Sequence, residues 1–345
     1  MAPTNVGNEI SPEAVEALLQ ACDDSVGLVR RYYELKRRLM GLSRLAAFDR
    51  YAPVGLEKTS TILLEEAQEL VVATFAEFSA AMGAVARRAF EDGWVDSPVA
   101  QGKCGGAFAY PVPFIHPFIL LNWAGSLEGA LTLAHELGHG VHQSMSATLP
   151  LLVGDVPITL AETASVFGEK LVFAKLMERA GREERLALLC SSIEEIIATS
   201  FRQAAITRFE QKLYEARAQG ELSVEAVNAM WLSTQKAALG GGIDLGGSYS
   251  WWWVYVHHLL RPFYCYGYVF GQVLVLALYA RYLEEGKSFA PKYLQLLAAG
   301  GSDSPANLLA KLGIDIESPD FWQGGFNGLK GMIEEAEALA AELGC

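Results

Sequence analysis

The chain has 345 residues, of which 51% are apolar, and it carries a net charge of −13 at pH 7. That length supports a large domain with a sizeable core. The negative charge argues against a nucleic-acid binder, which needs a basic stripe, and against binding to an anionic membrane surface. Five widely spaced cysteines without a C-x-x-C pair indicate reduced thiols, and no secretory signal is visible at the N-terminus. We therefore expect a cytoplasmic location.

The N-terminal third is predicted to be helical. Residues 11–42 and 59–92 place apolar side chains every three or four positions. Ser11 is expected to cap the first of these helices, with Pro12 at its first position. The composition then changes, because residues 94–124 are rich in Gly, Pro and aromatic residues. Two strand-like runs, 106–110 and 118–123, predict a small mixed or antiparallel sheet there.

Helical patterns resume at residue 126 and continue through 160–180, 183–219, 223–239, 263–285 and 326–343. Residues 263–279 approach the length of a membrane span. They include four tyrosines, two glycines and a glutamine, so a buried core helix is expected instead. The predicted fold class is mainly α with a small inserted β-sheet. We expect one domain over residues 1–345, with a helical part at 1–93, the sheet at 94–124 and the functional helices at 125–345.

One of these helices contains the sequence AHELGHGVHQ, residues 134–143. His135 and His139 share a helix face, because positions i and i+4 do, and both imidazoles can reach one metal ion. Glu136 lies about 100° round the helix, where it can touch a water on the metal without being a ligand. Two neutral imidazoles and a carboxylate suit zinc. The alternative is an ordinary helix with solvated histidines. It conflicts with the apolar residues around the motif, which indicate that the histidines are buried and need polar partners.

A third ligand is expected on the next helix, PITLAETASVFGEKLVF. Its only acids before Lys170 are Glu162 and Glu169, seven residues apart on one face. An antiparallel helix would bring Glu162 to the zinc and leave Glu169 two turns away, either as a partner of a ligand histidine or as a solvated surface acid. His142 is expected to face substrate or to be structural, rather than to be a fourth ligand. The sequence thus predicts one Zn²⁺ per chain.

HELGHGVHQ followed by ETASVFGE resembles the oligoendopeptidase F branch of the thimet oligopeptidase family of zinc metallopeptidases. The segments YYELKRRLMGLSRLAAFDRYAP, FEDGWVD, GKCGGAFAY and HHLLRPFYCYGYVFG follow that branch's order, so the resemblance runs from about residue 28 to 325. It implies a zincin-type catalytic domain. Family members usually carry a further large helical region before this part, and the two halves enclose a channel for short peptides. The chain is therefore expected to supply the catalytic half and to associate with such a region. Cys104 departs from the cationic or polar residue often found at its position.

The resemblance also assigns roles farther along the chain. It maps the family's catalytic histidine onto His257 and makes Tyr268 the first choice as donor to the oxyanion, Tyr266 the second and Tyr264 the third, with Tyr264 also a substrate contact. Three tyrosines at alternate positions cannot share one helix face, so packing is the alternative role for each. The strand-like run that begins at Gly105 and Gly106 is expected to pair with the substrate main chain.

The expected function is zinc-dependent endopeptidase action on short peptides. Glu136 is the expected general base, and a water activated by zinc is the nucleophile. Two alternatives stay open: a zinc carboxypeptidase on a related helical scaffold, and a non-catalytic peptide-binding subunit that needs the missing N-terminal helical half.

Overall fold

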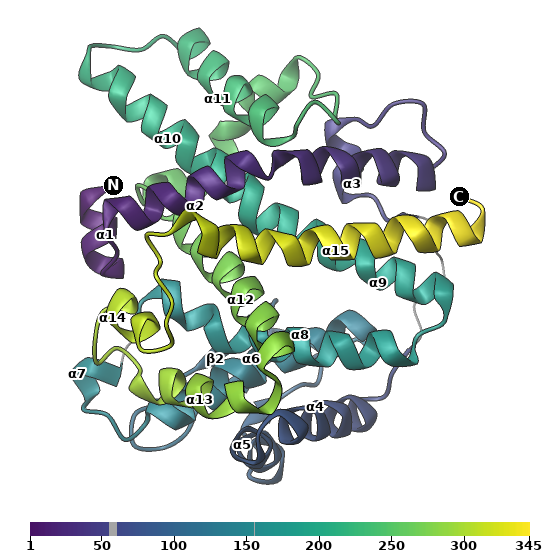
Figure 1. The fold of residues 1–345 in the computed structure, drawn as a ribbon, viewed down its shortest axis with the longest axis vertical. Coiled ribbons are helices and arrows are strands. Elements are labelled where there is room, and N and C mark those ends of the chain that lie inside the picture. Colours follow the sequence, from purple (N-terminus) through teal and green to yellow (C-terminus); the bar gives the residue numbers. More distant parts are fainter. Residues whose placement is uncertain (55–60, 155) are drawn as a thin grey trace. The chain divides into compact units, whose positions relative to one another are not determined.

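The computed structural model describes residues 1–54, 61–154 and 156–345. Helices dominate these residues and a three-stranded sheet is inserted among them, which confirms the predicted fold class (Figure 1). The chain divides into two compact units. Unit 1 comprises Met1–Glu57, Arg185–Ala277 and Ile316–Cys345, and unit 2 comprises Lys58–Glu184 and Leu278–Asp315. The sequence predicts three consecutive parts of one domain. Each of the two compact units is assembled from separated stretches of the chain, because long-range packing groups them and local composition does not report such packing.

The named elements of unit 1 are all helical. Its elements are α1 (Ala2–Asn8), α2 (Pro12–Asp24), α3 (Val26–Leu39), η1 (Ala47–Tyr51), most of α9 (Arg182–Ile197), the π-helical turn η2 (Ala198–Arg202), α10 (Gln203–Ala218), α11 (Val224–Ala238), the 3-10 turns η3 (Ser248–Tyr255) and η4 (His257–Leu260), the first part of α12 (Cys265–Glu285) and α15 (Pro319–Leu343). Ser11 caps α2 by accepting the Ala14 N–H, with Pro12 at the first position, which confirms that prediction.

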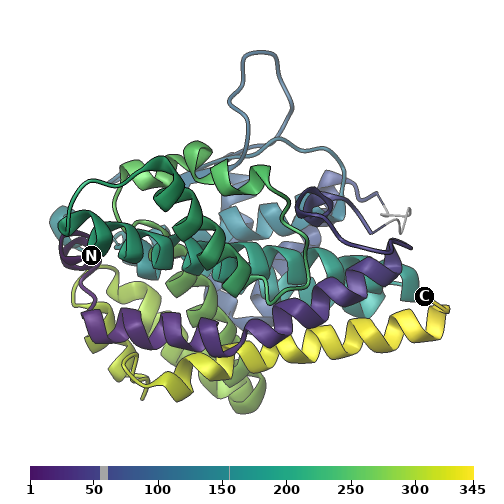
Figure 2. The same cartoon turned by 90° about the horizontal axis from the view of Figure 1, so that it is seen from above.

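The long helix α15 lies beside α2 and α3, as Figures 1 and 2 both show. This pairing buries the faces on which α2 and α3 concentrate their apolar side chains. Arg31 on α3 also forms ion pairs with Glu334 and Glu337 on α15. Helices far apart in sequence therefore share one core.

Unit 2 surrounds the HELGH helix. It contains α4 (Leu64–Phe78), α5 (Ala80–Glu91), β1 (Val95–Asp96), β2 (Phe108–Tyr110), β3 (Phe118–Leu120), α6 (Leu127–Ser146), α7 (Leu151–Gly154), α8 (Ile158–Arg179), the end of α12, η5 (Gly286–Ser288), α13 (Phe289–Ala299) and α14 (Pro305–Ala310). The helix predicted at 59–92 is two helices, because Ser79 is extended and caps α5; positions 59 and 60 lie outside the described residues. Phe167 of α8 stacks on Tyr293 of α13 at 4.4 Å, in the middle of this core.

The sheet of unit 2 has the strand order β1-β3-β2. β1 pairs parallel with β3 and β2 pairs antiparallel, with Ala109 opposite Ile119, so the sheet is mixed. β2 is an edge strand. One side of it is therefore not paired with another strand of the sheet.

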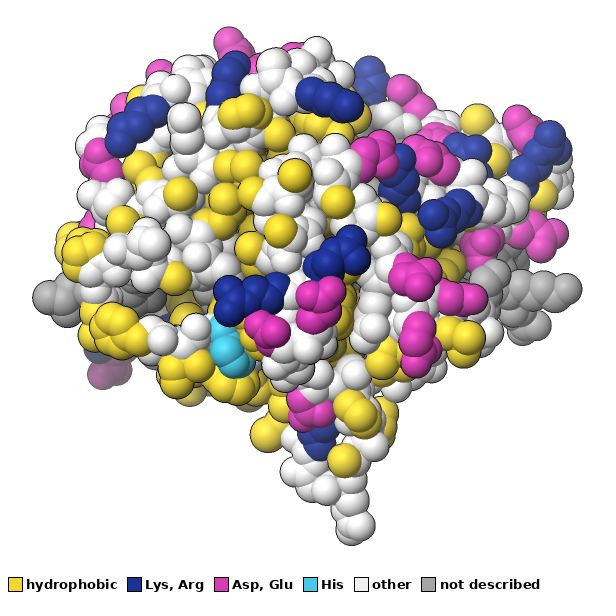
Figure 3. All heavy atoms as spheres, turned by 90° about the horizontal axis from the view of Figure 1, so that it is seen from below, with side chains coloured by type: hydrophobic (Ala, Val, Ile, Leu, Met, Phe, Trp, Pro, Cys, Tyr) yellow, Lys and Arg dark blue, Asp and Glu magenta, His cyan; other side chains and the backbone are white. Residues whose placement is uncertain are grey.

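The predicted core helix at 263–285 is α12, which begins at Cys265. Its residues Val269, Phe270, Val273 and Leu274 are fully buried. Among the described residues, none of the helices combines the length and apolar character that crossing a bilayer requires. The face in Figure 3 carries basic and acidic side chains side by side, with hydrophobic groups between them.

Candidate functional site

The site is built where α6 and α8 cross closely. A Cβ at Gly138 would lie 2.4 Å from the carbonyl oxygen of Ala164, and one at Gly168 would lie 3.2 Å from that of Ala134. The later residue of α6, Gly138, thus lies against the earlier residue of α8, Ala164, and Ala134 lies against Gly168. The two helices therefore run antiparallel. Glycine at these positions lets the two helix backbones approach closely. Side chains of α6 can therefore reach side chains of α8.

Three potential ligands converge at this crossing. The Nε2 atoms of His135 and His139 lie 3.4 and 3.6 Å from Oε2 of Glu162. Ligand atoms about 2.0–2.1 Å from a tetrahedral zinc are about 3.4 Å apart, so this spacing fits one such ion. Among the described residues, these three are the only group of His, Cys, Asp or Glu side chains with metal-binding spacing.

The charges of the three side chains suit a cation. Burial opposes ionisation of Glu162, but the hydrogen bond with His135, the histidine charges and the Ser165 hydroxyl at 2.8 Å hold its pKa at about 2. Burial lowers the pKa of His139 to about 4. Burial also disfavours the charged form of His135, yet its hydrogen bonds with Glu162 and Glu169 raise its pKa to about 10. The pocket thus holds an ionised carboxylate next to a His135 that is protonated at neutral pH, and a metal cation would take the place of that proton.

Glu169 lies behind the first ligand. Its Oε2 is 3.4 Å from Nδ1 of His135, and its side chain is 9% exposed. Of the two roles open from the sequence, this position matches the partner of a ligand histidine and not a solvated surface acid. Such a contact fixes the orientation of the imidazole and leaves Nε2 toward the metal.

Glu136 lies next to these three potential ligands and is not itself part of the group. It is 6% exposed, and its Oε2 has no hydrogen-bond partner among the described residues. Burial raises the pKa of Glu136 to about 7, against smaller opposing effects that include a hydrogen bond with the backbone of Ala109. A carboxylate with a pKa near neutrality and an unpaired oxygen is suited to accept a proton.

Edge strand β2 borders this carboxylate. Gln143 Nε2 of α6 donates to the Ala109 carbonyl at 3.3 Å, so α6 contacts the strand directly. The preceding loop is also fixed, because Asn122 Nδ2 donates to the carbonyls of Cys104 and Gly106. Gly105 and Gly106 are exposed within it.

A cleft of about 720 Å³ opens beside the potential metal ligands within unit 2, with His139 in its lining. Residues 111–117 line one wall, and His139, His142 and Gln143 line another. Its volume lies within the range of about 300–1,000 Å³ that is typical of ligand sites. His142 is 5% exposed, and burial lowers its pKa to about 4, so a neutral imidazole borders the cleft.

A second cluster forms within unit 1. Tyr264 and Tyr268 are four residues apart, and their ring centroids are 5.3 Å apart. His258 stacks on Tyr264 at 5.7 Å, and its Nε2 is 3.4 Å from the Tyr268 hydroxyl. The exposed ring of His257 lies 4.1 Å from that of His258. The structure therefore brings together His257, His258, Tyr264 and Tyr268.

Tyr266 points elsewhere. It is fully buried in unit 1, and its hydroxyl accepts a hydrogen bond from Asn8 Nδ2 at 3.0 Å. Its neighbours two positions away face the opposite side of the helix turn, as alternate positions must. The packing role fits this position, so Tyr266 is not retained among the candidate donors.

Sequence reasoning missed two residues of these clusters. Gln143 continues the row of His135 and His139 by another four positions, which was a sufficient signal to place it on the same face. The family resemblance assigns the catalytic role to His257, whereas the structure places its neighbour His258 against Tyr264 and Tyr268. Only the local 3-10 turn, which brings its ring onto Tyr264, distinguishes the two.

Comparison with known proteins agrees with this architecture. A family model described as peptidase family M3 matches residues 5–328. An oligoendopeptidase F homolog of Lactococcus lactis subsp. lactis is 30% identical over 97% of this chain and 56% of its own length, and oligopeptidase PepF of Bacillus subtilis is 28% identical over 96% and 50%. The crystal structure of oligoendopeptidase-F from Enterococcus faecium superposes with a TM-score of 0.76 at 21% identity, over 98% of this chain and 54% of that one, which shows a common fold.

The chain thus spans about half the length of the curated relatives that it matches. The match to the family model covers most of the chain. It includes α6 and α8, the two helices that carry the potential metal ligands. The chain belongs to peptidase family M3, in its oligoendopeptidase F branch.

Proposed function

We propose that this chain is the catalytic part of a zinc-dependent endopeptidase that hydrolyses internal bonds of short peptides. The observation that carries the proposal is the ligand spacing of His135, His139 and Glu162, with the unpaired carboxylate of Glu136 beside it. Membership of a peptidase family supports the reaction class. A partner helical region, which the family resemblance implies, belongs to the proposal as well, because the chain covers 56% of the length of that relative.

His135, His139 and Glu162 would hold the zinc, and Glu169 would orient His135. Zinc in such a site polarises a carbonyl and acidifies a water molecule. Glu136 takes the proton of the attacking water and delivers it to the leaving amine, which its pKa of about 7 permits in both directions.

Substrate binding is assigned to the edge strand and the cleft. Gly105 and Gly106 lead into β2, which would hydrogen-bond an extended peptide, while His142 borders the space for a side chain. From the family resemblance we retain His257 and Tyr268 as donors to the oxyanion. The contact between the Tyr268 hydroxyl and His258 supports the presence of a polar donor group there.

The test measures zinc content and hydrolysis of an internally quenched peptide, with and without a chelator. His139→Ala should lose the metal and the activity. Glu136→Gln should keep the metal and lose at least about 10²-fold in kcat. Glu128→Gln is the matched control, because Glu128 is an exposed acid on the same helix.

Mass analysis of the products separates the alternatives. Internal cleavage is expected. Removal of single C-terminal residues would identify a carboxypeptidase, and zinc binding without any hydrolysis would leave only peptide binding. A protein that contains no zinc after zinc-replete growth contradicts the proposal at its first step.

A further inference from the structure

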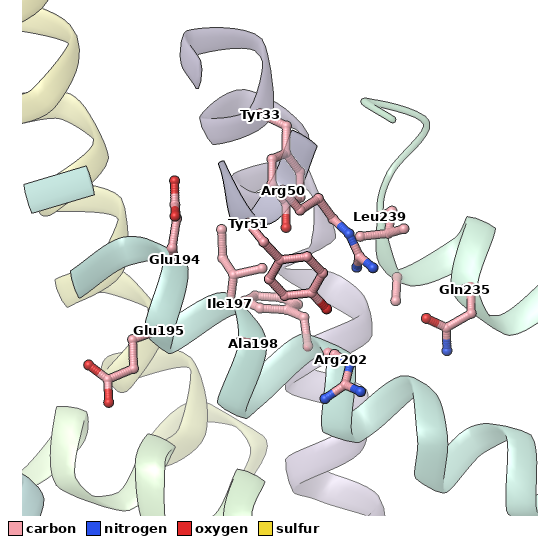
Figure 4. Close-up of a pocket in the computed structure, with 12 residues that line it drawn as sticks. Tyr33, Arg50, Tyr51, Glu194, Glu195, Ile197, Ala198, Arg202, Gln235 and Leu239 are labelled. Atoms are coloured by element: carbon pink, nitrogen blue, oxygen red, sulfur yellow. The ribbon is translucent and has the colours of Figure 1, made fainter. Parts of the chain in front are cut away.

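A separate cavity of about 270 Å³ lies wholly within unit 1 (Figure 4). It is larger than the roughly 150 Å³ cavity that can hold a benzene ring. Tyr33, Tyr51 and Phe201 give it aromatic walls, while Arg50, Arg202 and Gln235 provide hydrogen-bond donors. The wall includes the π-helical turn between α9 and α10, an irregularity that is frequent at functional sites.

Arg50 is the unusual group in this cavity. It is 6% exposed, and its Nε and Nη2 atoms donate only to neutral oxygens, the Ala47 carbonyl and the Tyr249 hydroxyl. Within the described part of the chain, no carboxylate pairs with it. A buried guanidinium without a counter-charge is costly, because burial removes its hydration. The guanidinium therefore favours an anion in the cavity.

The acids of the cavity do not supply that anion. Glu194 is held by the fully buried Lys36 at 2.7 Å and by the Tyr32 hydroxyl. In Figure 4 the carboxylates of Glu194 and Glu195 lie on one side of the view, whereas the Arg50 guanidinium lies on the other, toward Leu239 and Gln235.

Gln235 supplies an independent sign of a ligand. It is 2% exposed, and its Oε1 accepts from the Tyr249 hydroxyl at 3.3 Å while its Nε2 has no partner among the described residues. The opposite amide orientation would leave the Tyr249 proton without an acceptor, because Tyr249 already accepts from Arg50 at 3.0 Å. The Trp231 indole N–H fixes the backbone of Tyr249, so these donors are preorganised.

We infer that this cavity binds the carboxylate of a small organic acid with an apolar or aromatic body, of the size of one amino acid. Arg50 and the Gln235 amide would donate to the carboxylate oxygens, and the body would lie against the aromatic walls. The free acid and the C-terminal residue of a peptide present the same group. This inference does not depend on the proposed peptidase activity.

The test is a calorimetric titration of the protein with 3-phenylpropanoate and with its uncharged amide. The acid should bind at least about tenfold more tightly, as a charge-assisted hydrogen bond implies. Gln235→Glu should weaken binding of the acid by at least about tenfold and raise the melting temperature, because it adds the missing negative charge beside Arg50. A peptide ending in a free phenylalanine carboxylate competes if the cavity also admits chain ends.

Three further variants keep the result interpretable. Ala238→Phe fills the cavity without changing a charge and should abolish binding. Arg44→Gln removes an exposed arginine of the same unit and should leave binding unchanged. His139→Ala should also bind the acid normally. Loss of binding in His139→Ala places the acid at the metal centre and overturns the inference, as does equal binding of the acid and the amide.

Discussion

The hydroxyl of Tyr268 can be removed with little effect on packing. Tyr268→Phe keeps the ring that meets His258 and Tyr264 edge-on. If Tyr268 stabilises the oxyanion, kcat should fall by about 10²–10³ while KM and zinc content stay nearly unchanged. Kinetics on one fluorogenic peptide measure this. Tyr266→Phe is the control, because its hydroxyl meets Asn8 in the core. A normal kcat in Tyr268→Phe together with a collapse in Tyr264→Phe would reverse the assignment.

Glu210 predicts a pH dependence of stability. Its Oε1 accepts the Phe263 N–H at 2.8 Å, and burial raises its pKa to about 7. The unfolded chain has the ordinary value of about 4.3, so the folded state binds more protons between these values and loses stability as pH rises through that window. The loss is at most about 4 kcal/mol.

Glu210→Gln keeps an acceptor for the Phe263 amide and removes the titration. Melting temperatures of the two proteins at pH 5 and pH 8 test this. The wild type should lose more stability than Glu210→Gln between the two pH values. An identical change in both proteins would show that Glu210 is already ionised at pH 5 in the folded state.

At the scale of elements, we expect the crossing of α6 and α8 to control the proposed metal site. Gly138→Ala places a methyl group 2.4 Å from the Ala164 carbonyl oxygen, so the helices must separate. The distance from both histidines to Glu162 then grows, and we expect weaker zinc binding together with a stability loss of about 1–3 kcal/mol.

The matched control is Gly328→Ala. Gly328 is also helical, but an added Cβ there meets nothing within 4 Å. Helix propensity should make this variant slightly more stable, by about 0.5–1 kcal/mol. Zinc titration and thermal melts compare the two. Unchanged zinc affinity in Gly138→Ala would show that the crossing can relax without moving its ligands.

The elements also show what the sequence could predict. Periodicity located most helices, and the i, i+4 spacing together with the next helix located the three side chains that converge. β1 has only two residues and pairs in parallel with a strand more than twenty positions away, so no local pattern reports it. α13 and α14 follow short, irregular apolar runs, and tertiary contacts place α13 against α6 and α14 against α13. The burial of Tyr266 depends on Asn8, which is 258 residues away in sequence.

At the scale of the whole molecule, zinc should stabilise the two units unequally. The three ligands lie in unit 2, which has its own core around Phe167 and Tyr293. A ligand that binds only the folded state stabilises the region that contains its site. Hydrogen exchange should therefore slow in α6 and α8 when zinc is added, and much less in α10 and α11. His139→Ala should show no such difference, and equal protection in both units would mean that they unfold as one.

The pairing of α15 with α2 and α3 has a consequence for synthesis of the protein on the ribosome. Ser11 and its partner Glu317 are 306 positions apart, and helix α15 follows both. Helices α2 and α3 therefore leave the ribosome long before α15, and their apolar faces lack this partner until α15 has been synthesised as well. At about 5–20 residues per second that interval is tens of seconds. During this time a nascent chain offers α2 and α3 to chaperones, whereas α4 to α8 can already pack against one another.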